Sequence, residues 1–170
     1  ALVITDPYTD ISGATSPTYS TGTTTYAADN GDRYRCKLSA IGADADEFTS
    51  AALLTVYRTH NITTQPNNAT GNEGGTSSYT VAGNTSSGSH TYQWSKSDNG
   101  VDYNIIPGAT SATYTTPTLV FADDNDDRYK CTLSLEGAEN DLVSVFAVQT
   151  VLRVISISQQ PQPQTVIEGQ

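Results

Sequence analysis

Asp127-Arg-Tyr-Lys-Cys131 repeats Asp32-Arg-Tyr-Arg-Cys36, a stretch that lies 95 residues earlier in the chain. Laying residues 1–75 over residues 96–170 needs no gap, and about 32 of the 75 positions are identical. A fixed period of this size indicates an array of similar folding units. The 170 residues hold fewer than two periods, so we expect the chain to be a window of a longer array.

The composition favours strands and turns over helices. The chain has 36% hydrophobic residues, 13 Gly, 7 Pro and no Met, and its formal net charge is −10. Its eight Lys and Arg residues are scattered, whereas nucleic-acid binding needs a basic stripe. No stretch approaches the ~20 apolar residues of a membrane span. We therefore expect neither nucleic-acid binding nor membrane insertion.

Short strand signals recur through one complete period, residues 58–152. The alternation is clearest over residues 127–135, where Tyr129, Cys131 and Leu133 share one face. Asn99-Gly100 predicts a hairpin turn, and residues 67–75 are turn-rich. We predict strands over residues 62–66, 77–82, 90–96, 103–106, 112–115, 119–121, 127–135 and 142–152. The inward face of the last strand is ambiguous, because polar Gln149 alternates with Ala147 and Val151.

Glu73-Gly74, Val81, Trp94 and Tyr129-Lys-Cys131, in that order, resemble the pattern of an immunoglobulin domain. The resemblance implies an all-β fold of tandem immunoglobulin-like β-sandwiches with a 95-residue repeat. It implies that Trp94 packs on the link between the two sheets and that Tyr129 and Tyr34 form tyrosine corners. The implied structural core is Val81, Trp94, Tyr129 and Cys131, with Tyr34 and Cys36 in the other copy.

The chain departs from this family at residue 81, where Val stands in place of a frequent Cys. Each unit then keeps one half of the usual disulfide, and we expect no intradomain disulfide. The alternation places both Cys36 and Cys131 inward, as small buried hydrophobic residues. An intermolecular disulfide is the alternative, and it needs an exposed thiol.

The repeat divides the chain into three parts. We interpret residues 1–57 as the C-terminal part of an immunoglobulin-like domain, residues 58–152 as a complete domain, and residues 153–170 as the first strand of a third. Half a sandwich leaves its core face uncovered, so we expect residues 1–57 not to fold alone.

The residues that recur in the repeat point to a narrower class of proteins than the fold alone does. Tyr92-Gln-Trp94, residues 106–117 and residues 122–125 resemble immunoglobulin-like repeats of bacterial surface proteins and, most of all, of tailed-bacteriophage structural proteins. The resemblance implies a phage capsid decoration, neck or tail fibre protein on the virion surface. The alternatives are a bacterial cell-surface adhesin stalk and an accessory module of a carbohydrate-active enzyme.

Asp123, Asp124 and Asp126 form a calcium candidate, because hard cations prefer clustered carboxylate oxygens. Residues 28–32 of the first copy, which match residues 123–127, have fewer carboxylates, and the Glu that an EF-hand requires is absent at that spacing. The other interpretation is a turn before the strand that carries Tyr129, where Asp and Asn suit the backbone.

Two acidic loops are candidate binding loops, since loops at the ends of a sandwich carry recognition. Asp44, Asp46 and Glu47 form the first, and Glu139 and Asp141 form its counterpart. The alternative interpretation is a solvated hairpin tip in each copy.

The rest of the sequence offers few candidate residues for metal binding or catalysis. His60 and His90 have no Cys or second His at ligand spacing, so we expect no metal site at them. We find no phosphate-binding loop and no arrangement that favours nucleophilic catalysis, and we predict a non-enzymatic protein without a cofactor. The abundance of Tyr beside Ser, Thr and Asn is typical of adaptable recognition surfaces. Expected partners are other virion or surface proteins within a larger homo-oligomeric assembly, and cell-surface carbohydrate.

Overall fold

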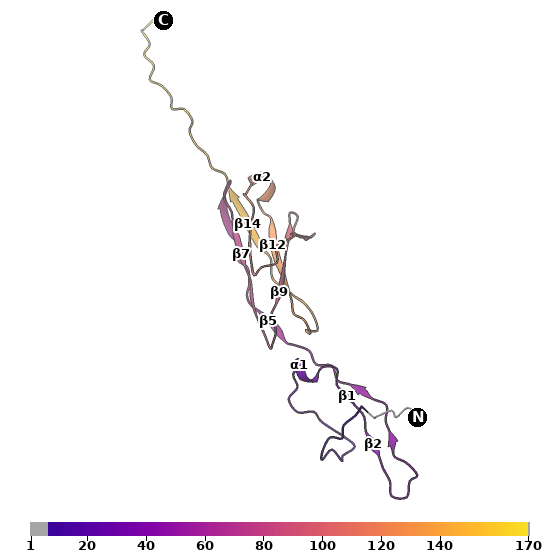
Figure 1. The fold of residues 1–170 in the computed structure, drawn as a ribbon. Coiled ribbons are helices and arrows are strands. Elements are labelled where there is room, and N and C mark those ends of the chain that lie inside the picture. The colour runs from indigo at the N-terminus through magenta and orange to yellow at the C-terminus, as the bar shows by residue number, and fades with distance from the viewer. Residues whose placement is uncertain (1–6, 170) are drawn as a thin grey trace. The chain divides into compact units, whose positions relative to one another are not determined.

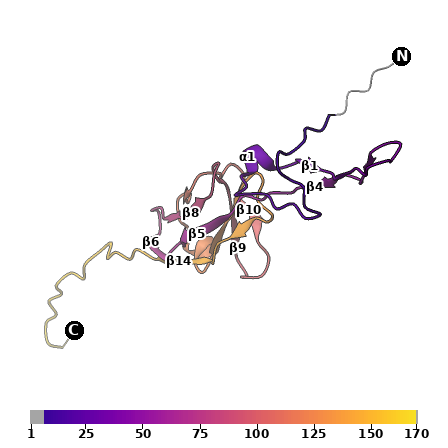
Figure 2. The same cartoon turned by 90° about the horizontal axis from the view of Figure 1, so that it is seen from below.

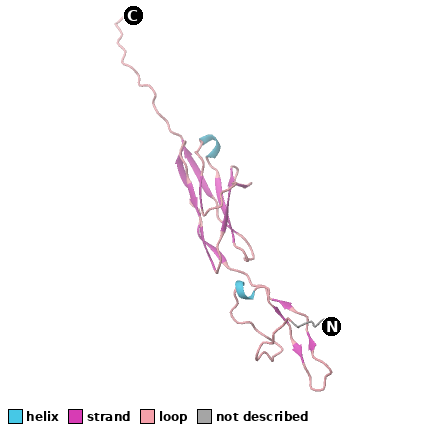
Figure 3. Cartoon of the chain, viewed as in Figure 1, coloured by secondary structure: helices cyan, strands magenta, loops and turns pink. Residues whose placement is uncertain are grey.

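The computed structural model describes residues 7–169. These residues form short strands and two four-residue helices (Figure 1; Figure 3). The chain divides into two compact units, Ala1–Arg58 and Thr59–Gln170. Within the residues described, no helix is long and apolar enough to cross a membrane.

Unit 1 consists of one helical turn and one irregular hairpin. Strand β1 pairs with β4 and β2 pairs with β3, both antiparallel. The elements are α1 (Tyr26–Asp29), β1 (Arg33–Tyr34), β2 (Lys37–Leu38), β3 (Glu47–Phe48) and β4 (Ala52–Leu53). None of residues 7–58 is buried, because no second layer faces this hairpin within the described part of the unit.

Unit 2 is a two-layer β-sandwich. Its larger sheet has the order β10-β9-β12-β14-β6, with β13 also paired to β12. The other layer contains the pairs β11-β7 and β5-β8. The strands are β5 (His60–Thr64), β6 (Ala69–Asn72), β7 (Ser78–Thr80), β8 (Ala82–Thr85), β9 (Thr91–Ser97), β10 (Asn104–Ile105), β11 (Thr113–Thr115), β12 (Arg128–Ser134), β13 (Leu142–Val143) and β14 (Ala147–Leu152), and α2 (Phe121–Asp124) precedes β12.

Among residues 59–169, all strand pairs are antiparallel except one. β14 runs parallel to β6, with Gln149 opposite Ala69 and Leu152 opposite Asn72. Figure 2 shows β6 beside β14 and β5 beside β8. This strand order is that of an immunoglobulin-like sandwich. The prediction of an all-β, immunoglobulin-like fold for residues 58–152 is therefore confirmed.

The core of unit 2 lies between the two layers. Trp94 and Cys131 are fully buried, and they are opposite each other in the register of β9 and β12. The Tyr79 ring stacks on the Tyr129 ring at a centroid distance of 4.6 Å. Trp94 Nε1 donates to the carbonyl of Ser111 at 2.9 Å, which satisfies the polar end of the indole. The buried cluster is Tyr79, Val81, Trp94, Tyr129, Cys131, Leu133 and Ala147.

Three local predictions were wrong. Residues 119–121 form no strand, because Phe121 starts α2. The turn-rich stretch 67–75 contains β6, which gains its hydrogen bonds from β14 and not from any local pattern. The last strand is split into β13 and β14, since Ser144 breaks the ladder by accepting from the Cys131 amide with its hydroxyl. Its inward face carries Ala147, Gln149 and Val151.

Residues 153–169 form no strand. A β-strand needs a hydrogen-bonded neighbour, and these residues have none among those described. The repeat aligns them with residues 58–74, which contain β5 and β6.

Candidate functional site

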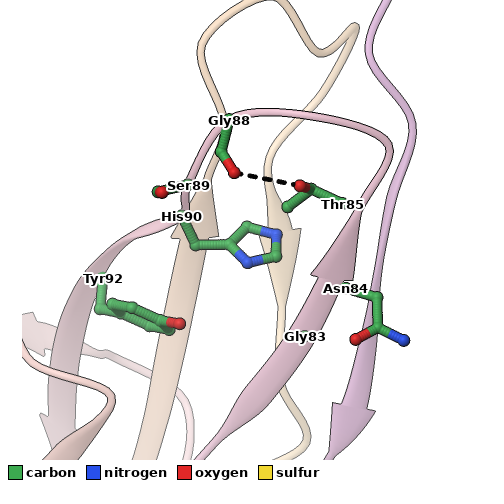
Figure 4. Close-up of a pocket in the computed structure, with 7 residues that line it drawn as sticks. All are labelled: Gly83, Asn84, Thr85, Gly88, Ser89, His90 and Tyr92. Carbon is green, nitrogen blue, oxygen red and sulfur yellow. Dashed lines mark hydrogen bonds between the residues drawn. The ribbon is translucent and has the colours of Figure 1, made fainter.

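An open pocket of about 520 Å³ lies between the end of β8 and the start of β9 (Figure 4). The Thr85 hydroxyl closes its loop by donating to the Gly88 carbonyl at 3.2 Å. The lining is polar and aromatic: Gly83, Asn84, Thr85, Gly88, Ser89, His90 and Tyr92. Such a surface can exchange hydrogen bonds with a polar ligand and offer an aromatic ring to it.

The pocket requires a glycine at residue 83. A Cβ there would lie 2.7 Å from the Asn61 carbonyl oxygen and 2.8 Å from His90 Cε1. Neither neighbour can yield easily, since one is backbone and the other is a ring held on both sides. Gly83 therefore allows β8 to pass close beside His90.

His90 forms a pair with His60, the first residue of β5. His60 Nδ1 lies 3.2 Å from His90 Nε2, and the ring centroids are 5.4 Å apart. His60 Nε2 lies 2.8 Å from the carbonyl oxygen of Asn140, in the turn between β12 and β13. Because a carbonyl only accepts, His60 Nε2 carries a hydrogen and donates it. The pair thus connects three segments at one end of unit 2.

This pair was missed at the level of sequence. His60 and His90 are 30 residues apart, and neither has a neighbour at metal-ligand spacing. The contact arises because β5 and β9 belong to different layers and both begin at the same end of the sandwich. Only the complete strand order could have revealed it.

The calcium candidate is occupied by protein contacts. Asp124 Oδ2 accepts from the Val120 amide at 2.8 Å, and its Oδ1 pairs with Lys96 Nζ at 3.1 Å. Asp126 accepts from the Asn125 side chain and has φ 68°, the left-handed turn conformation. Asp123 is exposed. Among the described residues, no three His, Cys, Asp or Glu side chains gather as a metal site.

The acidic loops keep most of their carboxylates in solvent. Asp44, Glu139 and Asp141 are exposed. Asp46 accepts from the Ser39 hydroxyl and lies 4.0 Å from Lys37 Nζ. Glu47 lies outside the predicted binding loop, because it belongs to strand β3.

The candidate core residues divide by unit. Val81, Trp94, Tyr129 and Cys131 lie in the buried cluster of unit 2. Tyr34 is half-buried, and Cys36 is exposed. The prediction that both thiols point inward is therefore confirmed for Cys131 and wrong for Cys36. Within the described residues, no opposing layer covers β1 and β2. Burial raises the pKa of the Cys131 thiol to about 11.

Cations cover aromatic faces at positions that lie 95 residues apart in the sequence. Arg35 Cζ lies 4.2 Å from the Tyr8 ring centroid and 4.2 Å from that of Phe48. Ninety-five residues later, Lys130 Nζ lies 3.8 Å from the ring centroid of Tyr103. One face of the Tyr8 ring and one face of the Tyr103 ring are therefore already covered by a side chain of the same unit.

A second set of cation–π contacts shows the same spacing in the sequence. Arg58 Cζ lies 4.3 Å from the Tyr26 ring, and Arg153 Cζ lies 4.1 Å from the Phe121 ring. The two pairs are again 95 residues apart. In each, an Arg packs on the first residue of a short helix, Tyr26 of α1 or Phe121 of α2.

Comparison with known proteins gives a partial family match. Residues 60–134 match the model of a domain of unknown function, DUF8696. This segment runs from β5 to the end of β12. No curated protein matches the sequence.

Solved structures with similar backbones include immunoglobulin domains 1–4 of Sidekick-1, at 15% identity and a TM-score of 0.47. That match covers 82% of this chain and 38% of the Sidekick-1 chain. The tandem Ig repeats of Dlar match at 16% identity and a TM-score of 0.44, covering 75% of this chain and 66% of that one. A chimeric titin Z1Z2 matches at 18% identity and a TM-score of 0.41, over 56% and 95% of the two chains.

Proposed function

We propose that the chain is part of a tandem array of immunoglobulin-like domains, with a 95-residue repeat, that serves as a non-enzymatic structural or attachment module of a phage virion. The array would form a capsid decoration, neck or tail fibre protein. Its action is to space and attach other components, without chemistry of its own. The main support for the array is that whole sets of contacts, and not only residue types, recur at an offset of 95 residues.

The recurrence extends to the turn before the tyrosine-bearing strand. Asn30 Oδ1 accepts from the Val56 amide at 3.0 Å, and Asn125 Oδ1 accepts from the Val151 amide at 2.9 Å. Each bond joins the turn to the segment that ends its own copy, and Val151 lies in β14. A shared ancestor of the two copies explains why an identical bond forms in both.

It extends also to the cysteine positions. The Cys36 amide donates to the Thr49 hydroxyl at 3.0 Å, and the Cys131 amide donates to the Ser144 hydroxyl at 2.9 Å. Thr and Ser both supply the hydroxyl acceptor that the bond requires. The two copies thus share their hairpin geometry even though one is uncovered.

The assignment to a virion surface rests on the resemblance of the repeat to phage structural proteins. A fold assembled without a disulfide supports it, because the core is completed by packing alone and can form in a reducing cytoplasm. The net charge of −10 supports a soluble, self-repelling array. Proposed partners are other virion proteins in a larger homo-oligomeric assembly.

The complete reading frame and its location in the source test this proposal. Purified phage particles should contain the chain by mass spectrometry, and antibodies against unit 2 should label a defined part of the particle. Recovery of the chain from the wall fraction of uninfected bacteria would instead support an adhesin stalk. A catalytic domain in the same polypeptide would support an accessory module of a carbohydrate-active enzyme.

Carbohydrate recognition is a second candidate function, and the pocket between β8 and β9 favours it. Tyr92 and His90 supply rings, and Asn84, Thr85 and Ser89 supply hydrogen-bonding groups. A glycan array probed with the chain tests it. Binding that is lost in Tyr92→Ala but kept in Tyr103→Ala would support this pocket, whereas equal signals for both variants would exclude it.

A further inference from the structure

We propose that His60 and His90 form an acid-sensitive latch, which fastens the start of β5 to the start of β9 at neutral pH and opens when both imidazoles are protonated. The inference does not depend on the proposed function. It rests on two distances: 3.2 Å between His60 Nδ1 and His90 Nε2, and 2.8 Å between His60 Nε2 and the Asn140 carbonyl oxygen.

Counting protons shows why the latch is sensitive to acid. The Asn140 carbonyl requires a hydrogen on His60 Nε2, so neutral His60 presents a lone pair at Nδ1. His90 Nε2 then donates to that lone pair. One added proton leaves the bond intact, because either ring can carry the charge and still share one hydrogen. A second proton places two N–H groups and two positive charges against each other, and the bond is lost.

The surroundings of the pair do not offset this charge. Tyr92 on β9 faces His90 with its ring, at a centroid distance of 6.1 Å. Gly83 and Asn84 on β8 are uncharged. Glu139 and Asp141 flank Asn140 in the turn, but both are exposed, so solvent screens them. Burial and the neighbouring His60 together lower the pKa of His90.

The direction of the effect on stability follows from linkage. A histidine whose pKa is lower in the folded state binds more protons in the unfolded state. Stability is then complete above the unfolded pKa of about 6.5. It falls as the pH drops below that value, and the loss is complete below the folded pKa. The latch therefore weakens in mildly acidic conditions.

The latch joins the two layers of the sandwich, and this makes its opening local. β5 is paired to β8 in one layer, and β9 belongs to the other. Thr59 and Ser86 exchange two hydrogen bonds beside the latch, at 2.8 and 3.1 Å, and neither bond involves a titrating group. Acid should therefore detach the β5–β8 edge from β9 at this end first, and the detached edge then opens to solvent more often than β12 does.

Amide hydrogen exchange of the whole chain tests the latch. After correction for the intrinsic pH dependence, protection of the β5 and β8 amides should fall about fivefold relative to that of the β12 amides between about pH 7.5 and pH 5, as expected for the loss of one hydrogen bond. The control is His90→Gln, whose amide nitrogen can donate to His60 but does not titrate. This variant should lose less than about twofold of the protection over the same range.

A titration of the two imidazoles by NMR keeps the test independent of the variant. The latch requires two separate protonation steps, and the second should occur below the ordinary range of the histidine pKa. The hydrogen bond between the two rings should be lost at that second step. Two independent titrations near the ordinary histidine pKa would overturn the proposal. So would an acid-dependent loss of β5 and β8 protection that is the same in His90→Gln as in the unmodified chain.

Discussion

The ammonium group of Lys96 lies 2.5 Å from Oδ2 of Asp127, whose side chain is only 2% exposed. Lys96 comes from β9, and Asp127 immediately precedes β12. The same ammonium group also contacts Asp124 at 3.1 Å. One partly exposed cation thus compensates a carboxylate that the fold has placed out of reach of water.

Removing that cation should destabilise unit 2. Lys96→Met keeps the aliphatic length of the side chain and leaves Asp127 buried without its partner, so we expect a loss of about 3 kcal/mol in the free energy of unfolding at neutral pH. Urea denaturation followed by Trp94 fluorescence measures it. The matched control is Lys130→Met, because the Lys130 ammonium group packs on the half-buried Tyr103 ring and, among the described residues, on no buried carboxylate; it should cost less than about 1 kcal/mol. Equal losses in the two variants would contradict the role given to Lys96.

The Lys96→Met variant should also respond to pH in a defined direction. Burial raises the pKa of the Asp127 carboxyl, and the Lys96 hydrogen bond and charge oppose that rise. Without Lys96 the pKa rises further, and the folded state binds a proton that the unfolded state does not. Stability is then lost as the pH rises through the folded pKa. The destabilisation relative to the unmodified chain should therefore be smaller near pH 5 than near pH 7.

The two thiols should differ sharply in reactivity. Cys36 is exposed and Cys131 is buried, and the raised pKa of Cys131, about 11, leaves little thiolate at neutral pH. A thiol-specific reagent should label one equivalent rapidly in the native chain and the second only on unfolding. In Cys36→Ser the rapid phase should vanish, and its persistence would show that Cys131 is accessible.

A buried hydrogen bond between Tyr79 and Gln149 offers a test of polar satisfaction in the core. The Tyr79 hydroxyl donates to Gln149 Oε1 at 2.6 Å, and both side chains are fully buried. Tyr79→Phe leaves that oxygen unpaired and should cost about 1–3 kcal/mol. The double variant Tyr79→Phe/Gln149→Leu should recover part of the loss, because it removes both polar groups together. Calorimetric melting of the single and double variants distinguishes these outcomes.

Gly83→Ala should be strongly destabilising, since its Cβ would meet the Asn61 carbonyl oxygen at 2.7 Å and the His90 ring at 2.8 Å. We expect a loss of about 2 kcal/mol or more, as for other overpacked positions. Gly22→Ala is the control, because nothing lies within 4 Å of a Cβ there, and it should change stability by less than about 0.5 kcal/mol. A melting temperature of Gly83→Ala equal to that of the unmodified chain would contradict the close approach of β8 to His90.

The parts of the fold that sequence predicted are those with a local signature. The alternation around Tyr129 and Cys131 predicted a strand that the structure places in β12, and Asn99-Gly100 predicted the β9–β10 hairpin. Asn99 Oδ1 accepts from the amides of Val101 and Asp102 in that turn. Such features depend on the residues within a few positions, so a single sequence carries them.

The parts that sequence missed depend on distant partners. β6 contains Gly71 and Asn72, which are poor strand formers, and it is a strand because β14 pairs with it. Gln149 faces inward because the Tyr79 hydroxyl satisfies it. The His60–His90 pair depends on the meeting of two layers. No alternation within one segment could have indicated any of these.

The parallel pairing of β6 with β14 has a mechanical consequence. Because the two strands run in the same direction, a pull that draws their outer ends apart along the strand axis loads the ladder in shear, and its hydrogen bonds must fail together. An antiparallel terminal pair would instead open one bond at a time, like a zipper. Unit 2 should therefore resist stretching through the β6–β14 ladder, which runs from the pair Ala69–Gln149 to the pair Asn72–Leu152. The lifetime of the unit under tension is set by how fast this short ladder breaks.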